Sequence, residues 1–147
     1  MTFILISDLD GTLLGQHDFD FNVIKSDIIN LLDTGHLLVL ASSKTKVEIE
    51  GFCDELGRSV PFIYENGAGV ENFCLINGCE APLNSHQNPK AIRTDALLSV
   101  WERYISLGLK SRCHFVRDMD RGDQQALLGL GTTALDRAMK RSFSLPF

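Results

Sequence analysis

The first part of the chain combines short, continuous apolar runs with a helical repeat of apolar positions. The apolar runs at residues 3–7, 37–41 and 60–64 predict three strands of a parallel sheet, with the first strand buried on both faces. Between the first two runs, apolar residues fall on one face of a helix that ends near Gly35; they are Val23, Ile24, Ile28, Leu31 and Leu32. The order strand, helix, strand predicts a right-handed crossover and an α/β fold.

A second helix is expected between the second and third strands. Thr45 and Glu48 have the spacing of a capping box, in which each side chain binds a backbone N–H of the other residue. We therefore expect a helix from about Lys46 to Leu56, with Gly57 just beyond its end.

A change in composition follows the third strand. Residues 70–76 predict another strand, and Asn77 with Gly78 forms a sequence typical of a hairpin turn. The segment 81–89 contains two prolines and is the expected domain boundary. We divide the chain there into residues 1–82 and residues 83–147.

The second part of the chain has weaker patterns. An apolar stripe from Ile92 to Ile105 predicts an amphipathic helix that packs its face against a core. Residues 112–116 predict a strand, and two short helices are expected near residues 124–128 and 134–141.

Composition excludes several classes of protein. The chain has 147 residues, of which 44% are hydrophobic, and a net charge of −5, so it is globular and poorly suited to nonspecific nucleic-acid binding. No apolar run is long enough to cross a membrane, and no signal peptide is recognisable, so we expect a cytoplasmic protein. None of the four cysteines forms a C-x-x-C pair, which favours free thiols.

The strongest chemical signal follows the first strand. Asp8 and Asp10 appear where that strand ends, and Gly11 permits a sharp turn of the backbone. Ligands of open α/β sheets bind at the carboxyl ends of strands, and two acids there need a positive partner. Mg²⁺ with a phosphate substrate satisfies this need. The alternative is an acidic turn that only caps the strand.

A second candidate region follows the second strand. The hydroxyl of Ser42, the adjacent Ser43 and the amide groups at the helix N-terminus form a potential anion site, and Lys44 adds a full positive charge. The alternative is that the two serines only cap the helix and that Lys44 is solvated.

The string D-L-D-G-T-L-L at residues 8–14 resembles the first motif of the haloacid dehalogenase-like phosphohydrolases. This resemblance implies that Asp8 is the nucleophile that forms an aspartyl-phosphate and that Asp10 is the general acid and base. It also implies that both carboxylates bind Mg²⁺ and that Ser42 binds the transferring phosphoryl group. Both chemical roles suit carboxylates.

Further strings resemble one branch of that superfamily. The S-S-K-T string at residues 42–45 resembles mannosyl-3-phosphoglycerate phosphatases, and E-N-G-A at residues 65–68 is similar to their turn after the third strand. The resemblance implies that Lys44 and Asn66 contact a small phosphorylated sugar-acid substrate, although Asn66 could equally serve the turn alone. The string R-S-F-S-L-P-F at residues 141–147 resembles their R-E-Y-S-E-P-F signature. Arg141 is then a candidate for the substrate carboxylate, with a surface arginine as the alternative, and Leu145 replaces the family glutamate.

The resemblance implies a particular architecture. Residues 1–82 correspond to the N-terminal part of a Rossmann-like parallel sheet, and residues 83–147 to the beginning of an inserted α+β cap domain. The family's later lysine and its G-D-x-x-N-D string have no counterpart here. The resemblance implies a Mg²⁺-dependent phosphatase that converts mannosyl-3-phosphoglycerate to mannosylglycerate and phosphate, and without the later motifs we expect its activity to be impaired. The alternatives are a general sugar-phosphate phosphatase and an inactive remnant that only binds a ligand or partner. We also expect an open sheet edge beside the first strand. The sequence does not indicate an oligomeric state.

Overall fold

The computed structural model describes residues 2–15, 19–77 and 84–147. Its strands are β1 (Ile4–Ser7), β2 (Leu37–Ala41), β3 (Phe62–Tyr64), β4 (Gly69–Glu71) and β5 (Ser85–Gln87). Its α-helices are α1 (Asn22–Asp33), α2 (Lys46–Leu56), α3 (Thr94–Tyr104), α4 (Leu107–Lys110), α5 (Arg121–Leu128) and α6 (Thr132–Ala138). Two 3₁₀ helices, η1 (Phe73–Asn77) and η2 (Val116–Asp118), complete the regular structure of the described ranges.

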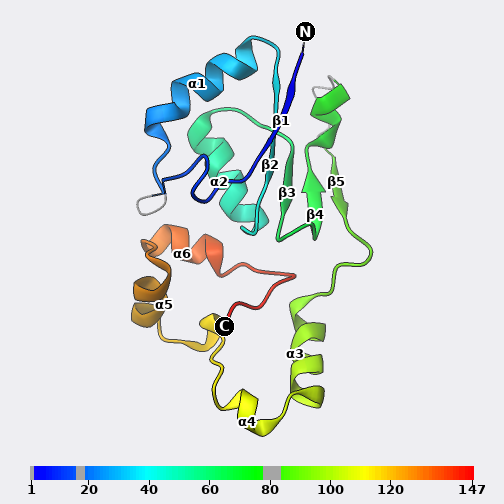
Figure 1. Ribbon diagram of the computed structural model, residues 1–147, viewed down its shortest axis with the longest axis vertical. Helices are drawn as coiled ribbons and strands as arrows, with labels where there is room; N and C mark the ends of the chain where they lie inside the picture. Colours follow the sequence, from blue (N-terminus) through cyan, green and yellow to red (C-terminus); the bar gives the residue numbers. More distant parts are fainter. Residues whose placement is uncertain (1, 16–18, 78–83) are drawn as a thin grey trace.

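The strands form one mixed sheet in the order β1-β2-β3-β4-β5 (Figure 1). The pairs β1–β2 and β2–β3 are parallel, whereas β3–β4 and β4–β5 are antiparallel. This arrangement confirms the predicted α/β fold. Because Ser7 is in register with Leu40, the segments that follow β1 and β2 leave the sheet at the same edge.

The helix α2 forms as its sequence predicts. The Thr45 side chain accepts a hydrogen bond from the Glu48 N–H, and the Glu48 carboxylate accepts one from the Thr45 N–H. At the other end, Gly57 adopts a left-handed conformation with φ of 75° and closes the helix. This capping box places the N-terminus of α2 directly after the carboxyl end of β2.

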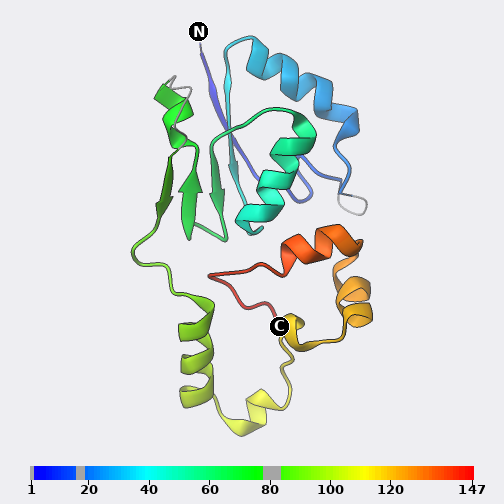
Figure 2. The same cartoon turned by 180° about the vertical axis from the view of Figure 1, so that it is seen from behind.

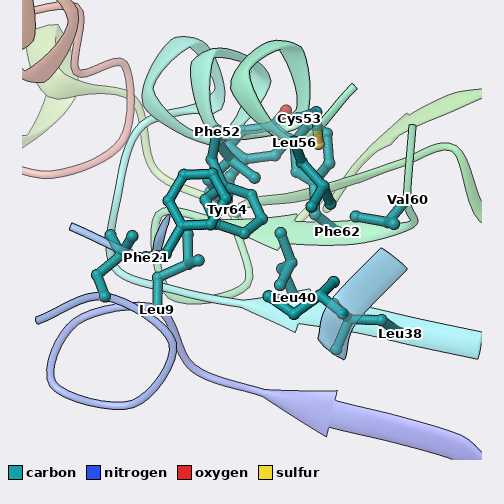
Figure 3. Close-up of a cluster of buried hydrophobic side chains, with 14 residues drawn as sticks. Leu9, Phe21, Leu38, Leu40, Phe52, Cys53, Leu56, Val60, Phe62 and Tyr64 are labelled. Atoms are coloured by element: carbon teal, nitrogen blue, oxygen red, sulfur yellow. The ribbon is translucent and has the colours of Figure 1, made fainter. Parts of the chain in front are cut away.

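The hydrophobic core lies between the sheet and the helices α1 and α2 (Figure 3). Phe62 from β3 and Leu40 from β2 are almost completely buried, and Leu56 contributes from α2. Each such side chain stabilises the fold by about 1.5–3 kcal/mol when it is removed from water. Leu9, which lies between the two candidate aspartates, is also fully buried, so the core anchors the loop that carries them.

The prediction that the first strand is buried on both faces is wrong. The side chains of Ile4 and Leu5 are about half exposed, and Ile6 is 71% exposed. The physical reason is that β1 is an edge strand, since β2 is its only neighbour among the described strands. The expected open edge beside the first strand is therefore confirmed for the described residues.

The strand expected at residues 70–76 is shorter than predicted. The strand β4 ends at Glu71 because Asn72 takes a left-handed φ of 59°, and the chain then enters η1. The Asn72 side chain donates a hydrogen bond to the carbonyl of Val60, which stabilises this departure. The expected turn at Gly78 and the expected domain boundary at residue 82 lie outside the described residues. The next described strand, β5, pairs with β4.

Two predictions for the second part of the chain are wrong. The helix α3 forms, but none of its residues is buried, so its apolar stripe does not pack into a core. Residues 112–116 form no strand, because the N–H groups of Arg112 and Cys113 are engaged by carbonyls of the preceding turn. The Val116 N–H donates to the carbonyl of Pro146 in the C-terminal segment. The two short helices expected near residues 124–128 and 134–141 are confirmed as α5 and α6.

The C-terminal part of the chain returns to the sheet domain, where α6 lies beside α2 (Figure 2). The Thr45 hydroxyl donates a hydrogen bond to the carbonyl of Arg137 over 3.0 Å. The Arg137 guanidinium passes so close to Gly51 that a side chain at position 51 would collide with it. Its Nη1 atom also lies 3.6 Å from the Glu55 carboxylate. Within the described ranges, no helix has the length and apolarity of a membrane span.

Candidate active site

Asp8 and Asp10 lie on a tight turn that follows β1. The carbonyl of Leu9 accepts hydrogen bonds from the N–H groups of three residues in this turn, which are Thr12, Leu13 and Leu14. Gly11 permits the turn with a φ of 68°. The Leu9 N–H donates a 2.7 Å hydrogen bond to Oδ1 of Asp8, which fixes the orientation of that carboxylate. The side chain of Asp10 is 42% exposed.

Ser42 lies at the end of β2 and is almost buried. Its hydroxyl oxygen accepts a hydrogen bond from the Lys44 N–H over 3.2 Å. Its backbone N–H donates to the carbonyl of Ile63, and its carbonyl accepts from the Asn66 N–H. The backbone contacts tie the Ser42 loop to the turn after β3, so the two loops lie side by side.

One open cavity of about 410 Å³ lies at this edge of the sheet. It is lined by Asp8, Ala41, Ser42, Ser43, Ile63, Asn66 and Gly67. The cavity thus brings Asp8 together with three of the residues expected to bind substrate. Asn66 has a left-handed φ of 58°, so it serves the turn and lines the cavity at the same time.

Lys44 does not line this cavity, because its side chain turns towards Asp10. Its Nζ atom lies 2.9 Å from Oδ1 of Asp10 and 3.6 Å from Oε1 of Glu48. The same ammonium group lies 5.1 Å from the centre of the Phe19 ring. Lys44 is therefore a counter-ion of Asp10, a role that its position in the sequence did not reveal.

Arg141 lies apart from the cavity but contacts its wall. Its Nη1 atom donates hydrogen bonds of 3.0 Å to the carbonyl of Ser43 and to the hydroxyl of Ser144. Together with Arg117 and Leu145, it lines a second cavity of about 350 Å³. The buried Nε atom of Arg141 has no hydrogen-bond partner in the part of the chain that the structure describes.

Glu65 is a residue of this region that the sequence did not single out. It is buried, and its carboxylate accepts hydrogen bonds from the N–H groups of Ser142 and Phe143 and from the Ser144 hydroxyl. Glu65 precedes Asn66 in the E-N-G-A turn, so the turn that lines the cavity also holds the C-terminal segment. The only sequence signal for this role was an acidic residue in that turn.

The donor chemistry at β1 fits a divalent cation. Asp8 and Asp10 supply two carboxylates, and Mg²⁺ in proteins is typically held by one or two carboxylates together with water and substrate phosphate. The described residues contain no group of three or more His, Cys, Asp or Glu side chains that converge as metal ligands. Within these ranges Asp8 lines the cavity, whereas Asp10 does not line it and pairs with Lys44 instead.

Comparison with known proteins agrees with this chemistry. Residues 5–88 match the family model of haloacid dehalogenase-like hydrolases, which is more than half of the chain. Over 67 residues the chain is 43% identical to a glucosyl-3-phosphoglycerate/mannosyl-3-phosphoglycerate phosphatase of Persephonella marina. Over 70 residues it is 34% identical to a protein of the same name from Methanococcoides burtonii. These alignments cover 46% and 48% of this chain, but only 25% and 26% of the two relatives.

A solved structure shows the same fold. A haloacid dehalogenase-like hydrolase from B. subtilis superposes on 95% of this chain with a TM-score of 0.55 and 18% sequence identity. The chain covers 50% of that protein, so it spans about half of a known structure of this fold. With the match to residues 5–88, these findings establish that the chain belongs to the haloacid dehalogenase-like hydrolases.

Proposed function

We propose that this chain carries the nucleophile and the phosphoryl-binding loops of a Mg²⁺-dependent phosphatase. The substrate is a phosphorylated sugar acid, with mannosyl-3-phosphoglycerate as the leading candidate and mannosylglycerate and phosphate as products. The observation that supports this proposal most is that Asp8 and Ser42 line one cavity at the carboxyl end of β1 and β2. The names of the two similar phosphatases support the substrate class. A cytoplasmic location is part of the same proposal.

The chain's own residues would carry out two displacement steps. In the first, an Asp8 oxygen attacks phosphorus while the bond from phosphorus to the sugar-acid oxygen breaks, and Asp10 donates a proton to that leaving oxygen. In the second, water attacks phosphorus and gives a proton to Asp10, and the bond between Asp8 and phosphorus breaks. A bound divalent cation would neutralise the phosphoryl oxygens in both steps.

The anion-binding groups come from two loops. Ser42 and Ser43 line the cavity just before the N-terminus of α2, where oriented amide groups favour a phosphoryl group. Asn66 faces the same space from the turn after β3. Arg141, which touches the Ser43 carbonyl, is our candidate for the carboxylate of the sugar acid.

Ligand binding without hydrolysis is the second candidate function. It is favoured by the ion pair between Lys44 and Asp10, because that pair engages the carboxylate that must exchange protons. A general sugar-phosphate phosphatase is a variant of the first proposal with a broader substrate.

One experiment separates these functions. Phosphate release is measured with Mg²⁺ and either mannosyl-3-phosphoglycerate or glucose 6-phosphate, while calorimetry reports binding. Our proposal predicts that the wild type releases phosphate from the sugar-acid substrate. It predicts that Asp8→Asn releases none but still binds this substrate. Equal release from both substrates would indicate the general phosphatase. Binding of the first substrate without release would indicate the second function, and release by Asp8→Asn at the wild-type rate would refute the role of Asp8.

A further inference from the structure

The guanidinium group of Arg141 is bound to the protein through one nitrogen atom. Its Nη1 atom donates to the Ser43 carbonyl and to the Ser144 hydroxyl oxygen, each over 3.0 Å. Its Nε atom is buried and has no hydrogen-bond partner among the residues that the structure describes. A buried N–H donor without an acceptor is costly, so the two contacts of Nη1 must hold the guanidinium group in this arrangement.

The Ser144 hydroxyl links Arg141 to a buried carboxylate. An arginine side chain only donates hydrogen bonds and a carboxylate only accepts them, so the hydroxyl must accept from one and donate to the other. It donates its proton to Oε2 of Glu65 over 2.8 Å, which leaves its lone pairs for Arg141. Glu65 therefore sets the direction of the hydroxyl and places a negative charge behind it, which strengthens the hydrogen bond from the guanidinium group.

Glu65 is itself firmly held. Only 5% of this residue is exposed, and its two carboxylate oxygens accept hydrogen bonds of 3.0 Å and 2.8 Å from the N–H groups of Ser142 and Phe143. The carbonyl of Ser142 in turn accepts a hydrogen bond from the N–H of Thr94 at the start of α3. Glu65 is thus a fixed point from which the Ser144 hydroxyl is directed.

The second cavity, of about 350 Å³, has a cationic lining. Arg117 and Arg141 line it, and none of the described residues around it is acidic. The Arg117 guanidinium lies 3.8 Å from the Asp118 carboxylate, but both side chains are more than half exposed, so water screens this pair. The cavity therefore favours a small anion. It adjoins the first cavity, because Arg141 contacts the carbonyl of Ser43, which lines that cavity.

We propose that Glu65 is a positioning residue, which holds Arg141 through the Ser144 hydroxyl so that the guanidinium group binds a small carboxylate in the second cavity. The carboxylate accepts the hydrogen bond of the Nε–H group, and Arg117 supplies a second positive charge. This inference rests on the proposed function, in which the carboxylate belongs to the sugar acid, but it does not require phosphoryl transfer.

Glycerate is the probe for this site, because it is a small hydroxy acid without a phosphoryl group. The Nε–H cross-peak of Arg141 in a ¹H–¹⁵N NMR spectrum of the full chain, assigned by its loss in Arg141→Lys, reports the contact. We expect glycerate to move this cross-peak to lower field, whereas glycerol, which lacks the charge, and inorganic phosphate leave it in place. By calorimetry, Arg141→Lys should bind glycerate about ten-fold more weakly and the more exposed Arg117→Gln about three-fold more weakly.

Replacement of Ser144 tests the positioning role. Ser144→Ala removes the link to Glu65, so without any ligand the Arg141 Nε–H cross-peak should broaden, and glycerate should bind about five-fold more weakly. Ser144→Thr keeps the hydroxyl and should restore both properties. Ser106→Ala is the matched control, because the exposed Ser106 makes no side-chain capping bond, and it should match the wild type. Unchanged backbone N–H cross-peaks of residues 142–143 in Ser144→Ala would show that Glu65 still holds the segment.

Three results would overturn the proposal. They are an Arg141 Nε–H cross-peak that glycerate does not move, a cross-peak that inorganic phosphate moves as far as glycerate does, and a Ser144→Ala variant that keeps the wild-type cross-peak and affinity. Phosphate release is not measured in this experiment. A chain that binds glycerate as described but releases no phosphate would support this inference and contradict only the proposed hydrolysis.

Discussion

The carboxylate of Glu65 accepts a 2.8 Å hydrogen bond from the backbone N–H of Phe143, a residue 78 positions later in the chain. The ring of Phe143 also lies 6.5 Å from that of Tyr64, and the Arg93 guanidinium lies 5.8 Å from the centre of the Phe143 ring. The C-terminal segment is therefore attached to the turn that lines the candidate active site. A movement of this segment would therefore displace that turn.

Replacement of Glu65 tests this attachment. Glu65→Gln keeps the shape of the side chain but replaces an acceptor of the Ser142 or Phe143 N–H by an NH₂ group. A buried donor without an acceptor costs about 1–3 kcal/mol, so we expect a loss of unfolding free energy of this size. Hydrogen exchange should become faster at residues 142–144. Unchanged exchange there, measured alongside the wild type, would show that the carboxylate does not hold the segment.

The contact between α2 and α6 makes a second prediction. Alanine at position 51 would displace the Arg137 guanidinium and weaken its contact with Glu55, while alanine itself favours the helix. We expect these two effects to cancel, so that the unfolding free energy measured with urea does not change. Hydrogen exchange in α6 should nevertheless become faster. Gly108→Ala, where nothing lies close to the added methyl group, is the matched control and should gain up to about 1 kcal/mol. Slower exchange in α6 of Gly51→Ala would contradict the packing.

The ion pair between Lys46 and Glu71 predicts a pH dependence. Burial lowers the pKa of Lys46, but the hydrogen bond and the charge of Glu71 outweigh it and raise the pKa above its ordinary 10.5. A raised pKa stabilises the folded state below pH 10.5, and this contribution disappears as the pH rises through the higher folded value. Wild type and the double variant Lys46→Met/Glu71→Gln should therefore converge in unfolding free energy between about pH 9 and about pH 12. If the difference in unfolding free energy between the two proteins stays constant with pH, Lys46 and Glu71 do not form a stabilising charged pair.

The open edge of the sheet predicts self-association. Ile6 is 71% exposed on β1, and an exposed apolar edge strand is a template for pairing with another chain. Ile6→Lys should reduce association, measured by light scattering, and change the unfolding free energy by no more than about 0.5 kcal/mol. Val23→Lys, at an 87% exposed position on α1, is the control and should leave association unchanged. If both substitutions reduce association equally, association depends on exposed apolar side chains in general and not on the edge of the sheet.

Local sequence signals predicted the elements around the candidate site well. The spacing of Thr45 and Glu48 gave the start of α2, and Gly57 gave its end, because capping depends on neighbouring residues. The apolar run at residues 37–41 matches β2, whose side chains are buried or partly buried. Asp8 and Ser42 line one cavity because parallel strands joined by a crossover end at the same edge of the sheet.

Long-range contacts explain what the sequence did not predict. The exposure of β1 depends on its place at the edge of the sheet, which its apolar composition does not encode. The helix α3 has the periodicity of a core helix but lacks a buried face. The partners of Glu65 come from contacts that form only after folding, since residues 77 to 79 positions apart meet there. The same holds for the ion pair of Lys44 with Asp10, but not for its local pair with Glu48.

The central claim is that Asp8 receives the phosphoryl group, and covalent trapping measures this most directly. The wild type is quenched during turnover, because Asp10 serves both proton transfers and Asp10→Asn would slow the formation of the intermediate as well as its hydrolysis. After acid quench of a reaction with mannosyl-3-phosphoglycerate and Mg²⁺, peptide mass spectrometry should find one added phosphoryl group on Asp8. The same group on Ser42 or another residue, or phosphate release without any covalent intermediate, would contradict the account.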